Sequence, residues 1–294
     1  VSVAGLLANL LAIPWVTMVV TPLALTGVLL PPLWVACGWA VQALLALLPP
    51  MAAWAHAVWH LPAAPPELAW AAVIGGFLLG GRWPVVWRLA GVGLMLPALL
   101  YQPPRPAWGE FELLAPDVGQ GSAVLVRTAR RDLMFDAGPR YRGAGDAGEA
   151  VLAPLLRRLG VSLDALVVSH EDSDHSGGAE SLLAAFGRAR YLSSHGPGPG
   201  PLSLAREGLA DGGSARCEAG QAWTWEGVSF TVLHPGPDDR ARWREGNALS
   251  CVLLVDNGRR RALLTGDIGI DQEVALAARH PTLARGVLML DSPL

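Results

Sequence analysis

The sequence has no lysine, only three cysteines, and no charged residue at all over its first 66 positions. All 22 basic residues are therefore arginine, and the heavy use of alanine, glycine and proline indicates GC-rich coding rather than selection for phosphate binding. The net charge of −3 gives no overall attraction for nucleic acid, so any such binding must be local. Cys37, Cys217 and Cys251 lack a Cys-x-x-Cys spacing and predict neither a disulfide framework nor a thiolate zinc site.

The uneven distribution of charge divides the chain into two unlike parts. Only Glu67, Arg82 and Arg88 precede Arg105, and all other charged residues follow it. A proline-rich connector lies at this change in composition. We therefore expect transmembrane helices over residues 1–101, a linker over 102–108 and a soluble domain over 109–294.

The first part offers several apolar stretches separated by prolines. A membrane span requires about 20 apolar residues. The candidates are residues 15–30, residues 33–48, a hairpin of 68–79 and 83–101 around Gly80-Gly81-Arg82, and a short segment, 1–13, closed by Pro14. A buried soluble core is the alternative, but a region with so few charges disfavours it. Arg82 and Arg88 favour the cytoplasm for the hairpin turn, and so the outer face for the soluble domain, whereas Arg105 argues for the opposite orientation.

Four side chains that can bind a metal follow an apolar run that predicts a buried strand over residues 165–168. They are His170, Asp172, Asp174 and His175. The alternation of the first three directs them to one side of an extended loop, and His175 stands at the start of a helix. Burying imidazole and carboxylate groups together is unfavourable unless a cation collects them. A polar surface loop is the alternative, and the clustering favours a divalent metal site.

The spacing His-x-Asp-x-Asp-His resembles the His-x-His-x-Asp-His signature of the metallo-β-lactamase fold. Asp172 stands where the signature has its second histidine, and this replacement resembles the version of the motif in the ComEC family of DNA-uptake competence proteins. In addition, Asn9-Leu10-Leu11-Ala12-Ile13-Pro14 resembles the end of that family's membrane domain. The resemblance implies an α-helical transmembrane region followed by an α/β metallo-β-lactamase-like αββα sandwich. Strands that end in polar residues and lead into helices independently indicate an αβ sandwich with its site along one edge.

The resemblance also assigns roles to two carboxylates elsewhere in the chain. Asp136 ends an expected strand and matches an aspartate that orients a ligand histidine, although alone it reads as a turn residue. Asp267, in Thr265-Gly266-Asp267, matches a carboxylate that bridges two metals, although alone it reads as a helix N-cap. The implied ligands, which are also the expected catalytic residues, are His170, Asp172, Asp174, His175 and Asp267.

A glycine-rich stretch is expected beside the site. Asp117-Val118-Gly119-Gln120-Gly121 is similar to the ComEC family's Asp-Val-Gly-Gln-Gly-Asp, with Ser122 in place of the final carboxylate. The resemblance implies that Asp117 and Gln120 support the site or contact substrate. A plain glycine-rich turn between strands is the alternative.

Several later residues are also candidates. Asn247 and Ser250 match an Asn-x-x-Ser of the ComEC family and could reach a substrate phosphate or cap the following strand. His195 lies near the position where the wider superfamily has a further metal ligand, which the ComEC branch does not dependably have. His234 is expected to be structural or near the site. The family's last histidine would follow residues 286–290, so we expect a fragment whose hydrolase domain is truncated at its C-terminus.

The resemblance implies a multi-pass protein of the bacterial inner membrane that internalises DNA for natural transformation. Its hydrolase domain would cleave phosphodiester bonds of the strand that is not imported, using two divalent ions. Manganese and zinc are the candidates, and the hard oxygen of Asp172 moves the preference away from zinc. The expected partners are single- or double-stranded DNA, the lipid bilayer, other DNA-uptake proteins and further copies of the chain.

Two alternatives stay open. The first is a DNA channel with a non-catalytic hydrolase-like domain that only grips DNA. The second is a membrane-tethered metallo-hydrolase of small esters or lactones.

Overall fold

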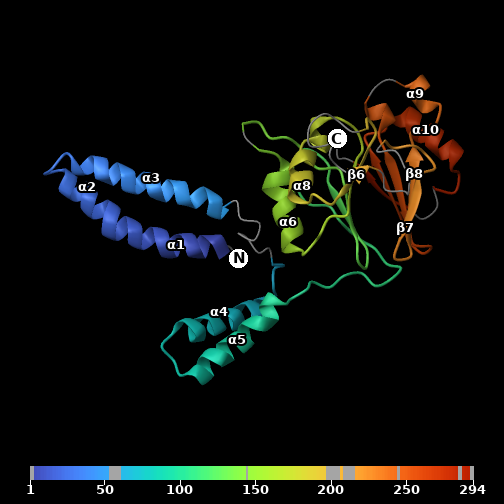
Figure 1. Cartoon of the computed structure of the whole chain (residues 1–294). Helices are drawn as coiled ribbons and strands as arrows, with labels where there is room; N and C mark the ends of the chain where they lie inside the picture. Colours follow the sequence, from blue (N-terminus) through green and yellow to red (C-terminus); the bar gives the residue numbers. More distant parts are fainter. Residues whose placement is uncertain are drawn as a thin grey trace. The chain divides into compact units, whose positions relative to one another are not determined.

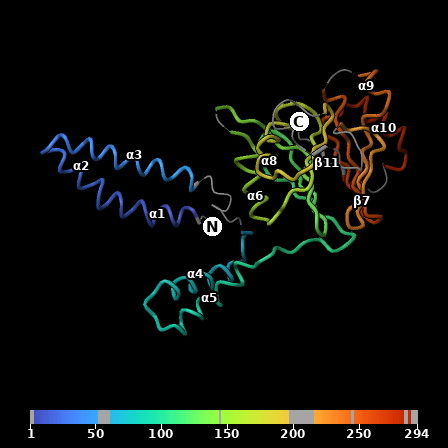
Figure 2. Tube along the Cα trace, in the orientation of Figure 1, coloured from blue at the N-terminus to red at the C-terminus, as the bar shows by residue number. Residues whose placement is uncertain are grey.

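A computed structural model describes residues 3–52, 61–143, 145–196, 206–207, 216–243, 246–283 and 287–291. The chain divides into two units, Val1–Leu61 and Pro62–Leu294, and each is described by itself. Figure 1 labels their helices and strands, and Figure 2 traces the same path as a tube.

Two apolar helical stretches of membrane-spanning length make up the described part of the first unit. Helix α1 (Val3–Trp15), the π-helical turn η1 (Val16–Val20) and α2 (Thr21–Gly27) join into one stretch over Ala4–Gly27, and α3 (Leu33–Ala52) is the second. They run side by side in Figure 2, and the Trp15 indole N–H donates to the Ala40 carbonyl at 3.0 Å. Their length and composition fit transmembrane helices.

The expected break at Pro14 is wrong, because the helix continues through it. Proline lacks the N–H that would bond one turn back, and a helix must absorb that loss. Here a π-helical turn follows, in which the Thr21 N–H donates to the Val16 carbonyl. A wider turn of this kind keeps the backbone helical past a proline. Residues 3–13 and 15–27 of the two predicted stretches are therefore parts of one helical stretch.

A helical hairpin opens the second unit, as the sequence predicted. Helices α4 (Pro66–Gly80) and α5 (Val85–Leu99) lie against each other at two glycines. A Cβ on Gly75 would lie 2.4 Å from the Gly91 carbonyl oxygen, and one on Gly91 would lie 2.6 Å from that of Gly75. Only glycine permits this approach of the two backbones, a device common where helices pack in membranes.

The rest of the second unit holds two sheets. The six-stranded sheet has the order β1-β2-β3-β4-β5-β6: β1 (Glu112–Leu114), β2 (Val124–Arg127), β3 (Asp132–Phe135), β4 (Ala165–Val168), β5 (Arg190–Ser193) and β6 (Arg206–Glu207). The five-stranded sheet has the order β11-β10-β9-β8-β7: β7 (Ala222–Trp225), β8 (Val228–His234), β9 (Val252–Asp256), β10 (Arg261–Gly266) and β11 (Val287–Asp291). The helical segments are η2 (Gly148–Leu152), α6 (Ala153–Arg158), α7 (Ser173–Ser176), α8 (Ala179–Ala185), α9 (Asp239–Arg242), η4 (Asn247–Leu249) and α10 (Ile270–Arg279).

Successive side chains along each strand point to opposite faces of the sheet, so they pack in different hydrophobic cores. In β3, Leu133 and Phe135 point between the two sheets, whereas Met134 points to the opposite face, against α6 and α8. In β10, Ala262 and Leu264 enter the inter-sheet core, and Leu263 packs toward α10. Figure 1 shows α6 and α8 on one side of the sheets and α10 on the other. The αββα sandwich predicted from the sequence is confirmed.

A disulfide joins the two sheets inside the inter-sheet core. Cys217 and Cys251 are both fully buried, and their Cα atoms lie 5.8 Å apart. The cysteine spacing predicted no disulfide, and this prediction was wrong. The partners are 34 residues apart and meet because Cys251 lies beside the end of β4 and Cys217 lies beside the end of the neighbouring strand β5. Such a pairing depends on tertiary structure and leaves no local spacing signal.

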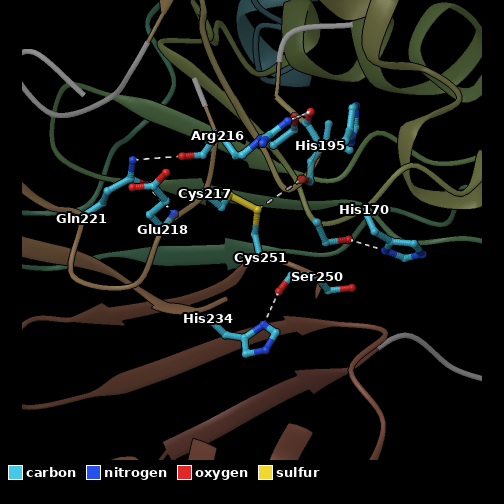
Figure 3. Close-up of a disulfide and its surroundings, with 12 residues drawn as sticks. His170, His195, Arg216, Cys217, Glu218, Gln221, His234, Ser250 and Cys251 are labelled. Carbon is cyan, nitrogen blue, oxygen red and sulfur yellow. Dashed lines mark hydrogen bonds between the residues drawn. A yellow bond between two sulfur atoms is a disulfide. The ribbon is translucent and has the colours of Figure 1, made fainter. Parts of the chain in front are cut away.

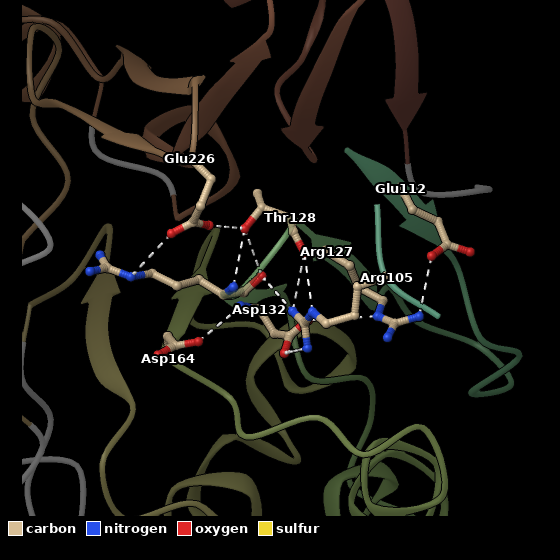
Figure 4. Close-up of polar contacts among 8 residues, drawn as sticks. Arg105, Glu112, Arg127, Thr128, Asp132, Asp164 and Glu226 are labelled. Carbon is tan, nitrogen blue, oxygen red and sulfur yellow. Dashed lines mark hydrogen bonds and ion pairs between the residues drawn. The ribbon is translucent and has the colours of Figure 1, made fainter. Parts of the chain in front are cut away.

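The connector is anchored at the end of the sandwich where β3 begins (Figure 4). The Arg105 guanidinium donates to both carboxylate oxygens of Asp132, at 2.8 and 3.0 Å, and also to the carbonyls of Thr128 and Arg131. Asp132 is fully buried; burial raises its pKa, although Arg105 and Arg127 act to lower it. A two-pronged ion pair of this kind fixes both the position and the angle of the connector.

Replacing Arg105 with alanine should destabilise the protein by about 1–3 kcal/mol, because the buried Asp132 carboxylate would keep only the more distant Arg127. Urea unfolding of the detergent-solubilised chain measures this change. The matched control is Arg130→Ala, which alters an exposed arginine and should shift stability by less than about 0.5 kcal/mol. Equal effects of the two substitutions would show that the pair does not anchor the connector.

Candidate metal centre

The parallel strands β3, β4 and β5 end at one edge of the first sheet, and β10 of the second sheet ends beside it. His170 follows β4, His175 lies in α7, and Asp267 follows β10. One ligand atom from each of these three side chains lies within 4.8 Å of the other two. Two loops that are almost a hundred residues apart in sequence therefore place nitrogen and oxygen donors around one point.

Asp136 contacts the residues around this candidate metal site through its side chain. It is fully buried, with a backbone φ of 61°, a conformation uncommon for a residue with a side chain. Its Oδ1 accepts the Ser169 N–H at 2.7 Å, and its Oδ2 accepts the Ser169 hydroxyl at 3.0 Å. The same Oδ2 lies 2.8 Å from Nδ1 of His175, which leaves the Nε2 of that ring facing Asp267 Oδ2 at 3.2 Å. A carboxylate in this position can orient the His175 ring, and that role of Asp136 stays a prediction.

Unpartnered polar atoms mark the place where a cation fits. Nε2 of His170, Nε2 of His175 and Oδ1 of Asp267 are buried and have no hydrogen-bond partner among the described residues. Such atoms carry a desolvation penalty that a divalent ion would remove. Asp172 and Asp174 lie alongside and are partly exposed, with Oδ2 atoms 3.5 Å from His170 Nε2 and 3.9 Å from His175 Nε2 respectively. All five expected ligands thus surround one site, and their roles as ligands stay predictions.

The two histidines differ in their affinity for protons. Burial lowers the pKa of His170, and the neighbouring His175 lowers it further, so this ring is a neutral donor. Burial also acts to lower the pKa of His175, but the carboxylates of Asp136 and Asp267 beside the ring outweigh burial and raise the pKa to about 10. The nearby His175 ring in turn lowers the pKa of Asp267.

The glycine-rich stretch supports the metal loop through its backbone. Gly121 has φ 148°, and a Cβ there would lie 2.3 Å from the Asp174 carbonyl oxygen, so no larger residue fits. The Ser122 N–H donates to that same oxygen at 3.1 Å. Asp117 accepts the Gly119 N–H, and the Asp117 and Gln120 side chains are exposed. The described contacts favour the structural alternative for this stretch and leave any role with substrate a prediction.

The remaining candidates lie around the centre rather than within it. Asn247 is exposed, and Ser250 is buried with a hydroxyl that has no hydrogen-bond partner among the described residues. The buried His234 donates from Nδ1 to the Ser250 carbonyl at 2.9 Å, and its Nε2 lies 3.3 Å from Asp239, as a structural histidine would (Figure 3). His195 bonds through Nε2 to the Tyr191 hydroxyl at 3.4 Å and is not part of the three-residue donor group.

Sequence reasoning missed Ser169. This buried serine bonds to Asp136 through both its N–H and its hydroxyl, and the hydroxyl also lies 3.0 Å from Nδ1 of His170. It therefore links the orienting carboxylate to both histidines of the loop. Its position directly before His170 was the available signal, but a serine at the end of a strand is too common to be diagnostic.

The chain belongs to the metallo-β-lactamase superfamily, whose family model matches residues 116–290. Membership implies that the domain binds divalent metal. Residues 1–88 match the competence protein family, so the resemblance to ComEC-type proteins is confirmed: a competence-protein region precedes a metallo-β-lactamase domain.

Two curated relatives match 61% and 93% of the chain. Over 280 residues the chain is 33% identical to Competence protein ComA of Neisseria gonorrhoeae, covering 93% of this chain and 37% of the relative. Recombination protein 2 of Haemophilus influenzae is 34% identical over 179 residues, covering 61% of this chain and 21% of the relative. A solved metallo-β-lactamase from Cronobacter sakazakii has 19% identity and a TM-score of 0.42, covering 65% of this chain and 78% of that one. The chain thus spans well under half the length of these curated relatives.

Replacing Asp136 with asparagine should weaken divalent metal binding by about 10–100-fold, because the amide cannot hold His175 and Ser169 as the carboxylate does. Equilibrium dialysis against Mn²⁺ or Zn²⁺, followed by elemental analysis, measures the change. Asp238→Asn is the matched control at an exposed position and should leave binding unchanged. Unaltered affinity in the Asp136 variant would contradict the orienting role.

Metal binding should release about one proton per chain from His175. The pKa of this ring is about 10, so the ring is protonated at neutral pH and a cation must displace that proton. Affinity should therefore rise with pH across the neutral range. Titration calorimetry in buffers with different ionisation enthalpies counts the proton. Binding heats that do not depend on the buffer would rule out this protonation state.

Proposed function

We propose that the chain is part of a multi-pass inner-membrane protein that internalises DNA, and that its hydrolase domain cleaves phosphodiester bonds of the strand that is not imported. The match of residues 1–88 to the competence protein family supports the DNA-uptake part of this proposal. The names of the relatives, Competence protein ComA and Recombination protein 2, agree with it. The expected partners are single- or double-stranded DNA, the bilayer, other uptake proteins and further copies of the chain.

The observation that carries the nuclease proposal is the convergence of His170, His175 and Asp267, flanked by Asp172 and Asp174. Two divalent ions held there, manganese or zinc, would activate water and neutralise charge on a phosphodiester. Three carboxylates in this donor set favour hard oxygen-binding cations, which suits phosphate chemistry better than lactam chemistry. The chain's own part is to hold the donors rigidly through Asp136 and Ser169.

A cavity of about 360 Å³ beside the metal loop offers room for part of a substrate. Arg140, Tyr191 and His195 are among its lining residues. Burial raises the pKa of Tyr191 to about 12, so its hydroxyl stays protonated and can donate to His195. Arg140 supplies positive charge at the surface, within reach of Glu180 at 3.8 Å. Glu171 and Glu180 also line the cavity, so attraction for phosphate would have to come from the bound cations.

The hydrolase domain is proposed to face the outer side of the membrane. Arg82 and Arg88 flank the turn of the α4–α5 hairpin and favour the cytoplasm for that turn. Arg105 argued for the opposite orientation, but its charge is paired with the buried Asp132. A paired charge folded onto the hydrolase domain is weaker evidence for topology than the two arginines at the turn.

Replacing Asp174 with alanine should abolish Mn²⁺-dependent cleavage of single-stranded DNA while the circular dichroism spectrum stays unchanged. The assay uses the whole protein, with the exposed Asp271→Ala as the matched control. Unchanged turnover in the Asp174 variant would defeat the assignment. DNA binding without cleavage by the unaltered protein would select the non-catalytic alternative, and activity on a lactone but not on DNA would select the small-ester hydrolase.

A further inference from the structure

The disulfide between Cys217 and Cys251 lies directly against the strands that carry the metal loop (Figure 3). Cys217 precedes β7 and donates its N–H to the carbonyl of Ser193, the last residue of β5. Cys251 precedes β9, and its sulfur lies 3.5 Å from the carbonyl oxygen of Val168, the last residue of β4. The bond therefore ties the ends of two strands in the first sheet to the start of a strand in the second.

A short chain of contacts connects this bond to the metal ligands. The Cys251 N–H donates to the Ser169 carbonyl at 2.8 Å. The Ser169 hydroxyl in turn contacts Asp136 Oδ2 and His170 Nδ1, both at 3.0 Å. Any movement of Cys251 would thus be passed directly to Ser169, whose hydroxyl contacts His170.

Both sulfur atoms lie in the apolar core between the sheets, beside Leu192, Val167 and Leu253. Because the cysteines are fully buried, a soluble oxidant or reductant reaches them only when the domain opens. The bond must therefore form while the sandwich is assembling or has opened. Its formation removes two electrons and two protons from the two thiols, and these reduce the disulfide of a thiol oxidant to a dithiol. Such oxidants act outside the cytoplasm, which agrees with the proposed outer-face orientation.

We propose that the Cys217–Cys251 disulfide is a structural requirement of the metal centre, so that the cation site forms at full affinity only in a domain that has been oxidised. The bond keeps β9 against β4 and thereby holds Ser169 where it orients His170. This inference concerns metal binding and does not depend on nuclease activity.

The test begins with a thiol count on the full chain, isolated from membranes without reductant and alkylated after denaturation. One of the three cysteines, Cys37, should react, and all three should react after reduction. The double variant Cys217→Ala/Cys251→Ala should then melt about 5–15 °C lower than the unaltered protein. Its affinity for Mn²⁺, measured without DNA, should fall by about 10-fold or more. Cys37→Ala is the matched control, since Cys37 is also buried but lies in the first unit, and it should change neither quantity.

Three reactive thiols in the unreduced protein would overturn the proposal, as would a double variant that binds Mn²⁺ as tightly as the Cys37 variant. If the double variant does not fold, graded reduction of the unaltered protein replaces it. Loss of Mn²⁺ should then coincide with the appearance of the two buried thiols. Mn²⁺ retained after both thiols are alkylated would contradict the proposal. Because no step uses DNA, a failure of the nuclease proposal leaves these outcomes unchanged.

Discussion

The hydrogen bonds of one buried carboxylate, Asp136, hold the metal loop in place. Asp136 directly follows β3, accepts two hydrogen bonds from Ser169 at the end of the neighbouring strand, and contacts the ring of His175. Removing a carboxylate and two imidazoles from water costs several kcal/mol, and a structure retains them only when each has partners. Asp136 provides the partners on the protein side. The unpartnered atoms on the other side of the two rings define the position of the cation.

The sandwich supports this arrangement from several directions. Parallel pairing of β3 with β4 places Asp136 next to Ser169, and β10 of the second sheet brings Asp267. Gly121 packs under the Asp174 carbonyl. The Arg105–Asp132 pair lies where β3 begins, and Asp136 lies just beyond its end, so the connector is anchored away from the metal loop. The connector and the candidate metal site are therefore at opposite ends of β3.

The sequence predicted those parts of the structure that depend on local spacing. His170, Asp172, Asp174 and His175 lie in one short loop after a buried strand, and strands that end in polar residues and lead into helices predicted the αβ sandwich. The disulfide could not be predicted, because its cysteines meet only where the neighbouring strands β4 and β5 end. The continuous helix through Pro14 depends on a π-helical turn for which the sequence gives no signal. The role of Ser169 likewise depends on Asp136, which is 33 residues earlier in the chain.

The central claim is that donors from two separate loops share one cation site, and anomalous X-ray diffraction from crystals grown with Mn²⁺ tests it most directly. Data collected at the manganese absorption edge should show a peak within about 2.0–2.6 Å of Nε2 of His170 or His175 and of an Asp267 oxygen. A fully ordered loop with no anomalous peak among these atoms, or a peak that only surface carboxylates contact, would contradict the account.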